Sequence, residues 1–155
     1  LYPHGLDPIE FLLSANEGDD LRQLRKAASG GEMSRIMLAI KKVILSADIV
    51  ESLVFDEVDA GIGGKTSEVV GKKLKSLAME RQVLVITHLP QIAAMSDVHF
   101  TVQKENIGGR VTTLVKKLSR REKVNEVARM LAGEKVTELS VRHAEEMIAL
   151  AEKGG

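Results

Sequence analysis

The alternation of hydrophobic and polar positions predicts short strands and amphipathic helices along the chain. Two apolar runs, SLVF at 52–55 and QVLVIT at 82–87, are typical of parallel strands that are covered on both faces. Between them, residues 65–80 repeat apolar positions at helical spacing. The buried side expected for this helix consists of Val69, Val70, Leu74, Leu77 and Ala78. Strand, helix and strand over 52–87 therefore predict one βαβ unit.

A second amphipathic helix is predicted before this unit. From Ser29 the sequence S-G-G-E has the spacing of a capping box, which predicts a helix over residues 30–46. Its apolar stripe consists of Met33, Ile36, Met37, Ile40, Val43 and Ile44. Further upstream, IEFLLSA at 9–15 predicts a short buried strand.

After His88 the hydrophobic pattern no longer predicts a βαβ unit, and it predicts an antiparallel hairpin and helices instead. The elements expected there are a short helix from Pro90, a hairpin of residues 98–104 and 110–118 around ENIGG, and helices near 120–132 and 136–152 that are separated by Gly133. At 155 residues, the chain is expected to form one domain over 1–155.

Composition excludes several classes of function. With 44% hydrophobic and 28% charged residues the chain is in the globular range, and no apolar run approaches the roughly 20 residues needed to span a bilayer. It has no cysteine, which excludes disulfides, cysteine nucleophiles and thiolate zinc sites. Lys+Arg and Asp+Glu both count 22, so no net basic charge indicates nucleic acid. Aromatic residues, at 3%, are too few for a base-stacking platform.

Candidate chemistry gathers where the two parallel strands end. Asp56 and Glu57 follow the first strand and His88 follows the second, and open α/β sheets bind ligands outside the carboxyl ends of their strands. Adjacent carboxylates after an apolar run are costly unless they hold a cation or positioned hydrogen bonds. The alternative is a turn or helix cap. The other histidines, expected to be structural, are His4, His99 and His143.

The sequence GGKT resembles the end of a phosphate-binding P-loop, but the match fails. A P-loop reads G-x-x-x-x-G-K-[ST], and the position five before Gly64 is Asp59 instead of glycine. A carboxylate there would repel the phosphate chain. Lys65 and Thr66 are therefore expected to begin the helix that follows.

The two glycines of ASGGE need an explanation beyond capping. A capping box accounts for Ser29 and Glu32, but each glycine weakens the helix by roughly 1 kcal/mol relative to alanine. A phosphate that approaches the helix N-terminus would explain the bare backbone, since it meets free N–H groups and the positive end of the dipole.

Three stretches, in order, resemble motifs of ABC-type ATPase heads. KAASGGEMSRIMLA is similar to the signature motif, SLVFDEVDAGIG to the Walker B strand with its D-loop, and VLVITHLPQIAAMSD to the switch-histidine loop. Their form is closer to SMC-like proteins than to transporters, whose Walker B usually continues with Pro-Thr. More narrowly, SGGEMSRIMLA, DEVDAGIGGKTS and THLPQIAAMSD resemble the RecN family of bacterial SMC-like DNA-repair ATPases. The resemblance runs from about residue 9 to 150.

The resemblance implies an α/β fold: the C-terminal lobe of an ABC/SMC-type head, with a largely parallel central sheet, flanking helices, and a C-terminal hairpin plus two helices. It implies that Asp56 holds Mg²⁺, that Glu57 is the general base and that His88 contacts the γ-phosphate of ATP. The signature residues implied to bind nucleotide of the opposite head are Ser29, Gly30, Gly31 and Glu32. Asp59 and Gly61 would line the interface between heads.

No P-loop occurs in these 155 residues, nor do the Q-loop lobe or coiled coil of the family. The chain therefore fits a C-terminal fragment, expected to be inactive alone. The implied partners are the N-terminal lobe of the same protein, a second head in an ATP-dependent homodimer, and DNA. No membrane partner is implied, and the implied location is the bacterial cytoplasm, at the nucleoid.

Two alternatives remain from other classes. The chain could be a non-catalytic scaffold or DNA-binding module, against which the intact Glu57 and His88 argue. It could also be a transporter nucleotide-binding domain, but DEVDAGIG departs from the transporter form. The hairpin residues able to reach DNA phosphates are Lys104, Arg110, Lys116 and Lys117; hairpin charges are more often solvated.

Overall fold

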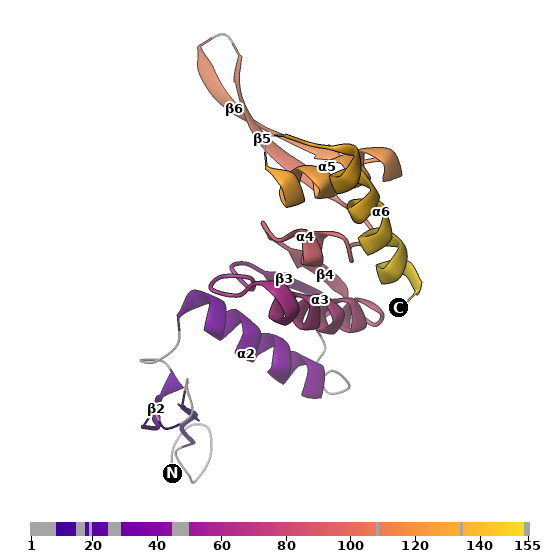
Figure 1. Cartoon of the computed structure of the whole chain (residues 1–155). Helices are drawn as coiled ribbons and strands as arrows, with labels where there is room; N and C mark the ends of the chain where they lie inside the picture. The colour runs from indigo at the N-terminus through magenta and orange to yellow at the C-terminus, as the bar shows by residue number, and fades with distance from the viewer. Residues whose placement is uncertain are drawn as a thin grey trace.

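The computed structural model describes residues 9–14, 18, 20–24, 29–44, 50–107, 109–133 and 135–153. Within them the chain forms three two-stranded sheets and five helices (Figure 1). In chain order these are β1 (Leu12–Leu13), β2 (Arg22–Gln23), α2 (Gly30–Val43), β3 (Ser52–Phe55), α3 (Gly64–Ala78), β4 (Gln82–Val85), α4 (Pro90–Ala93), β5 (Phe100–Ile107), β6 (Arg110–Lys117), α5 (Arg120–Ala132) and α6 (Glu138–Lys153).

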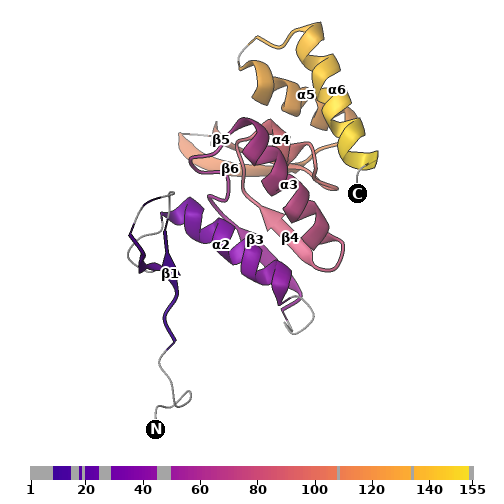
Figure 2. The same ribbon diagram turned by 60° about the horizontal axis from the view of Figure 1, so that its bottom comes forward.

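The predicted βαβ unit is confirmed. β3 and β4 pair in parallel, with Ser52 opposite Gln82 and Phe55 opposite Val85, and α3 connects them. Helices α2 and α3 lie side by side against this small sheet (Figure 2). The core between them consists of Leu38, Phe55, Val58, Val70, Leu74, Leu77 and Ile92. One face of the sheet is therefore buried by helices.

The opposite face of the β3–β4 sheet is bare in the part of the chain that the structure describes. Side chains alternate along a strand, so Val54 and Leu84 point away from the helices, and they are 66% and 49% exposed. Ile86, just after β4, is 60% exposed. The prediction of strands covered on both faces is therefore correct for one face only.

A second core joins the C-terminal helices to α4. Val127 and Ala128 of α5 pack with Ala144 and Ile148 of α6. Lys123 of α5 is nearly buried, and its ammonium group donates to the carbonyl oxygens of Ala94 (2.9 Å) and Ser96. Both helices were predicted: α5 has the predicted bounds, and α6 begins two residues later than expected.

The antiparallel hairpin extends further than its sequence indicated. Pairing runs from Phe100 opposite Lys117 to Ile107 opposite Arg110, which leaves only residues 108 and 109 between the strands. Gly109 has φ 82°, in the left-handed region that two-residue hairpin loops require. The hairpin projects beyond α5 and α6 (Figure 1).

Two predictions about the N-terminal third need correction. The strand predicted over 9–15 is reduced to β1, and it is not buried, since Ile9 and Phe11 are 85% and 66% exposed. Residue 15 lies outside the described residues. The α2 helix is described over Gly30–Val43, and the predicted end at residue 46 lies outside the described residues. Its buried apolar side chain is Leu38, which the predicted stripe omitted. Leu38 and Gly31 lie on the face of α2 opposite the predicted stripe, and that face is the one packed against the described residues.

No described helix combines the length and the apolar character required to cross a membrane.

The buried side of α3 generates a stability prediction. Leu77 is fully buried, whereas Val69, also predicted to be buried, is 50% exposed on the same helix. We expect Leu77→Ala to lower the free energy of unfolding by about 2–5 kcal/mol, because it leaves a cavity in the core. The matched variant Val69→Ala should change it by less than about 0.5 kcal/mol. Urea unfolding monitored by circular dichroism measures both, and equal losses would contradict this account of the core.

Candidate functional site

The candidate site lies where β3 and β4 end. Asp56 and Glu57 follow β3 directly and are exposed, and His88 follows β4 with 74% of its side chain exposed. Because β3 and β4 are parallel neighbours, their carboxyl ends share one edge of the sheet. The structure thus brings together the strand ends that the sequence had separated by about 30 residues.

Asp59 joins the turn after β3 to the loop after β4. Its Oδ2 accepts hydrogen bonds from Thr87 Oγ1 (2.6 Å) and from the backbone N–H of His88 (2.9 Å), and it lies 3.0 Å from His88 Nδ1. Burial by itself raises the pKa of Asp59, but the hydrogen bonds from Thr87 and His88 outweigh burial and hold the pKa below its ordinary value. The group is therefore a carboxylate at neutral pH.

The side chain of Asp59 is buried within its own chain. Only 4% of this side chain is exposed, and its place at an interface between heads stays a prediction. Its carboxylate faces its own chain because the Thr87 hydroxyl and the His88 N–H donate to it. Gly61 is exposed, as an interface residue would be, and has φ 71°.

Glu57 has an unusual backbone conformation. Its φ is 56°, and among the described residues no other non-glycine has a positive φ. Such a conformation costs about 1–3 kcal/mol and persists only where the surroundings hold it. The carboxylate of Glu57 lies beside Gly30, at the N-terminus of α2, where negative charge is favourable.

The first turn of α2 packs tightly on the turn formed by residues 56–60. A Cβ on Gly31 would lie 2.8 Å from Ala60 Cβ and 2.9 Å from the carbonyl oxygens of Glu57 and Ala60. The sequence alone favoured a phosphate as the reason for the two glycines, but Gly31 has a reason within its own chain. The capping box is confirmed: Ser29 N–H donates to Glu32 Oε2 (2.8 Å), and Glu32 N–H donates to Ser29 Oγ (3.3 Å).

Two further residues of α2 hold this turn and were missed from sequence. Ser34 Oγ donates to the Asp56 carbonyl oxygen (2.6 Å). Arg35 Nη1 donates to the carbonyl oxygens of Ala60 (2.8 Å) and Val58 (3.3 Å). Both residues lie outside the predicted apolar stripe, so hydrophobic periodicity gave no signal for them.

Lys65 is exposed in the first turn of α3, which begins at Gly64. The structure thus confirms that Lys65 and Thr66 start a helix.

The described residues contain no group of three or more His, Cys, Asp or Glu side chains that could hold a metal ion. Two exposed carboxylates, Asp56 and Glu57, follow β3, and Asp56 Oδ1 accepts the N–H of Glu57 (2.9 Å). One carboxylate suits Mg²⁺, which keeps several waters and binds substrate phosphates.

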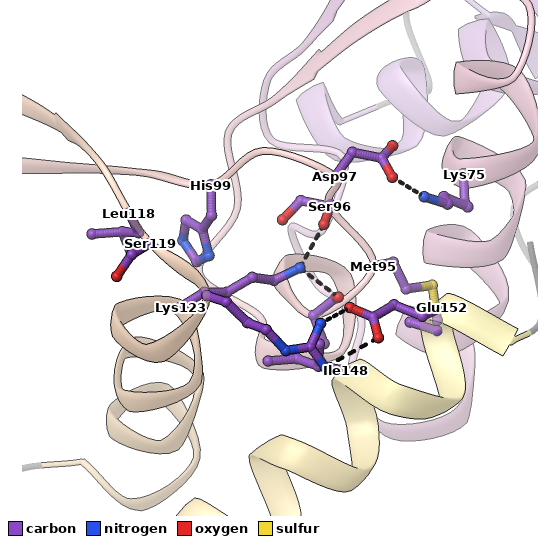
Figure 3. A pocket seen from close by; sticks show the side chains of 13 residues that line it. Lys75, Met95, Ser96, Asp97, His99, Leu118, Ser119, Lys123, Ile148 and Glu152 are labelled. Atoms are coloured by element: carbon purple, nitrogen blue, oxygen red, sulfur yellow. Dashed lines mark hydrogen bonds and ion pairs between the residues drawn. The ribbon is translucent and has the colours of Figure 1, made fainter.

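A cavity of about 210 Å³ lies elsewhere, between α5, α6 and the segment after α4 (Figure 3). It contains the ion pairs Lys75–Asp97 and Arg120–Glu152 together with Lys123 and His99. Burial, and secondly the charge of Lys123, lower the pKa of His99. None of the predicted site residues lines this cavity.

The adjacent glycines of α2 generate a prediction with an internal control. Gly31→Ala should lower the free energy of unfolding by about 1–3 kcal/mol, because the backbone of the 57–60 turn must shift. Gly30→Ala should change it by less than about 0.5 kcal/mol, since only the flexible end of Glu57 must move. Urea unfolding compares the two, and equal effects would contradict tight packing at Gly31.

Sequence identity to known proteins indicates the family of this chain. No protein-family model matches the chain. The chain is 48% identical over 153 residues to the DNA repair protein RecN of Bacillus subtilis, covering 99% of this chain and 27% of the relative. It is 48% identical to RecN of Treponema pallidum and 46% identical to RecN of Streptomyces coelicolor, covering 94% and 96% of this chain and 26% of each relative.

A solved structure from work on ATP-driven dimerization and DNA-stimulated activation of SMC ATPases resembles the fold, with a TM-score of 0.50 and 24% identity, covering 76% of this chain and 70% of that chain. This likeness supports the α/β lobe of an SMC-type head as the fold. By its sequence identities, the chain belongs to the RecN family and spans about a quarter of the length of the relatives it matches.

Proposed function

We propose that this chain is the C-terminal lobe of an ATPase head in a RecN-type DNA double-strand-break repair protein. ATP binding joins two heads, and hydrolysis separates them. The observation that carries the proposal is the convergence of three segments at one edge of the sheet. The N-terminus of α2, the 56–60 turn and the loop that contains His88 meet there through Gly31 and Asp59.

The exposed side chains at this edge suit hydrolysis of a phosphate anhydride. Asp56 would provide a carboxylate ligand for Mg²⁺, which when bound neutralises phosphate charge. Glu57 would accept a proton from the attacking water as general base. His88 would contact the γ-phosphate. Glu57 and His88 are held in place through one short turn, because Asp59 lies two residues after Glu57 and binds the His88 loop.

The signature residues would act on the nucleotide of the second head. Ser29 and Gly30 are exposed at the N-terminus of α2, where backbone N–H groups and the helix dipole favour an anion. Gly31 keeps the helix against the 57–60 turn, and Glu32 completes the cap. A second head that docks its nucleotide here would also contact the exposed Gly61.

The bare face of the β3–β4 sheet supports the proposed division into lobes. Val54, Leu84 and Ile86 form an exposed apolar patch on it, and such patches mark surfaces that another part or partner covers. The N-terminal lobe of the same protein is the proposed cover. It would bring the P-loop that these 155 residues lack.

The central test separates nucleotide binding from chemistry in the full-length protein. Glu57→Gln should lower ATP turnover by about 10²–10⁴-fold, because a general base contributes that much to rate. It should keep ATP bound and so trap the ATP-joined pair of heads. ATP hydrolysis, nucleotide binding and ATP-dependent association measure the three effects.

Two variants serve as contrasts. Asp56→Asn should weaken Mg²⁺-dependent nucleotide binding, and Ser29→Arg should block association of heads while nucleotide still binds to each one. If Glu57→Gln hydrolyses ATP near the wild-type rate, Glu57 is not the base and the proposed function loses its central residue.

Lys65 gives an independent prediction about the P-loop-like sequence. Lys65→Ala in the full-length protein should leave ATP hydrolysis within a few-fold of wild type, because the residue starts α3 and follows no glycine-rich phosphate loop. Nucleotide binding by calorimetry is the check. Loss of ATP affinity in this variant would make Lys65 a phosphate ligand and contradict its assignment.

A further inference from the structure

We propose that Asp59 is a positioning residue that fixes the protonation pattern and the orientation of His88. Asp59 would hold a hydrogen on Nδ1 of the imidazole, so that Nε2 is the nitrogen available to substrate phosphate. The inference rests on the proposed function for its catalytic meaning, but its structural part stands on the hydrogen bonds of this chain alone.

The Asp59 carboxylate is a buried hydrogen-bond acceptor, and the imidazole ring of His88 beside it is exposed. Asp59 Oδ2 lies 3.0 Å from His88 Nδ1, and the two side chains are 4% and 74% exposed. The same oxygen accepts the backbone N–H of His88 and the hydroxyl of Thr87. Three contacts from two consecutive residues thus converge on one oxygen, which sets the direction of the ring relative to its own backbone.

The chemistry of the pair determines where the ring hydrogen lies. An ionised carboxylate only accepts hydrogen bonds, so its position 3.0 Å from Nδ1 favours a hydrogen on Nδ1 over a bare ring nitrogen. In a histidine, the bond made by one ring nitrogen sets the state of the other. Nε2 is then bare in the neutral ring and carries a hydrogen in the imidazolium. A phosphate oxygen needs a donor, so the imidazolium, backed by the Asp59 carboxylate, is the form that contacts substrate.

Thr87 strengthens the same arrangement without touching the ring. Its hydroxyl donates to Asp59 and accepts the N–H of Leu89 (3.0 Å), which ties the main chain on both sides of His88. Loss of the Thr87 hydroxyl should loosen this loop but keep the Asp59–His88 contact. Thr87→Val is therefore the matched control for a merely structural effect.

The first experiment reads the ring directly. The chain has four histidines, so ¹⁵N-histidine NMR can resolve His88, assigned by the signal lost in His88→Gln. Without nucleotide, at a pH where the ring is neutral, we expect the wild-type chain to carry its hydrogen on Nδ1. Asp59→Leu should abolish this preference, because no acceptor then remains for a hydrogen on Nδ1. Thr87→Val should keep it on Nδ1.

The second experiment measures the consequence in the full-length protein. Asp59→Leu, which removes the acceptor that orients the ring, should lower kcat for ATP hydrolysis by about 10²-fold, the cost of a misplaced reacting group, with KM for ATP changed less than a few-fold. Thr87→Val should lower kcat less. A wild-type ring with its hydrogen on Nε2, or an Asp59→Leu protein with wild-type kcat, would overturn the inference. Either result leaves the proposed function intact, since that depends on Glu57→Gln.

Discussion

The first turn of α2 can lie on the backbone of the 57–60 turn only because Gly31 has no side chain. The rest of the candidate site depends on this contact. With the helix this close, Ser34 and Arg35 reach three carbonyl oxygens of the 56–60 turn. Turn carbonyls without such donors would be left to water, and the left-handed conformation of Glu57 would have less to hold it.

Asp59 extends the same rigid unit to the second strand. Its neighbours in the turn, Val58 and Ala60, accept hydrogen bonds from α2, while Asp59 itself accepts them from Thr87 and His88. One short turn therefore links the helix that carries the signature-like sequence to the loop that carries the histidine. A movement of α2 would be transmitted to His88 through few bonds, which is a physical basis for coupling between two proposed heads.

Exposed apolar surface is the other general feature of the chain. The outer face of β3 and β4 and part of the α2 stripe, such as Val43, are uncovered by the described residues. Sequence patterns report how hydrophobic a face is, and they do not say which segment covers it. These faces are predicted from the sequence to be buried, and they are exposed in the structure of a chain that spans about a quarter of the length of its RecN relatives.

The sequence by itself determined the local elements: the βαβ unit, the capping box at Ser29, the hairpin and the two last helices, because periodicity and caps act over a few residues. It also determined the family, through three ordered motifs. Tertiary structure decided what the motif residues do to one another. The burial of Asp59, the donors Ser34 and Arg35 and the packing reason for Gly31 all join residues more than 20 positions apart. Such contacts depend on how close two backbones come after folding, and no local pattern encodes that distance.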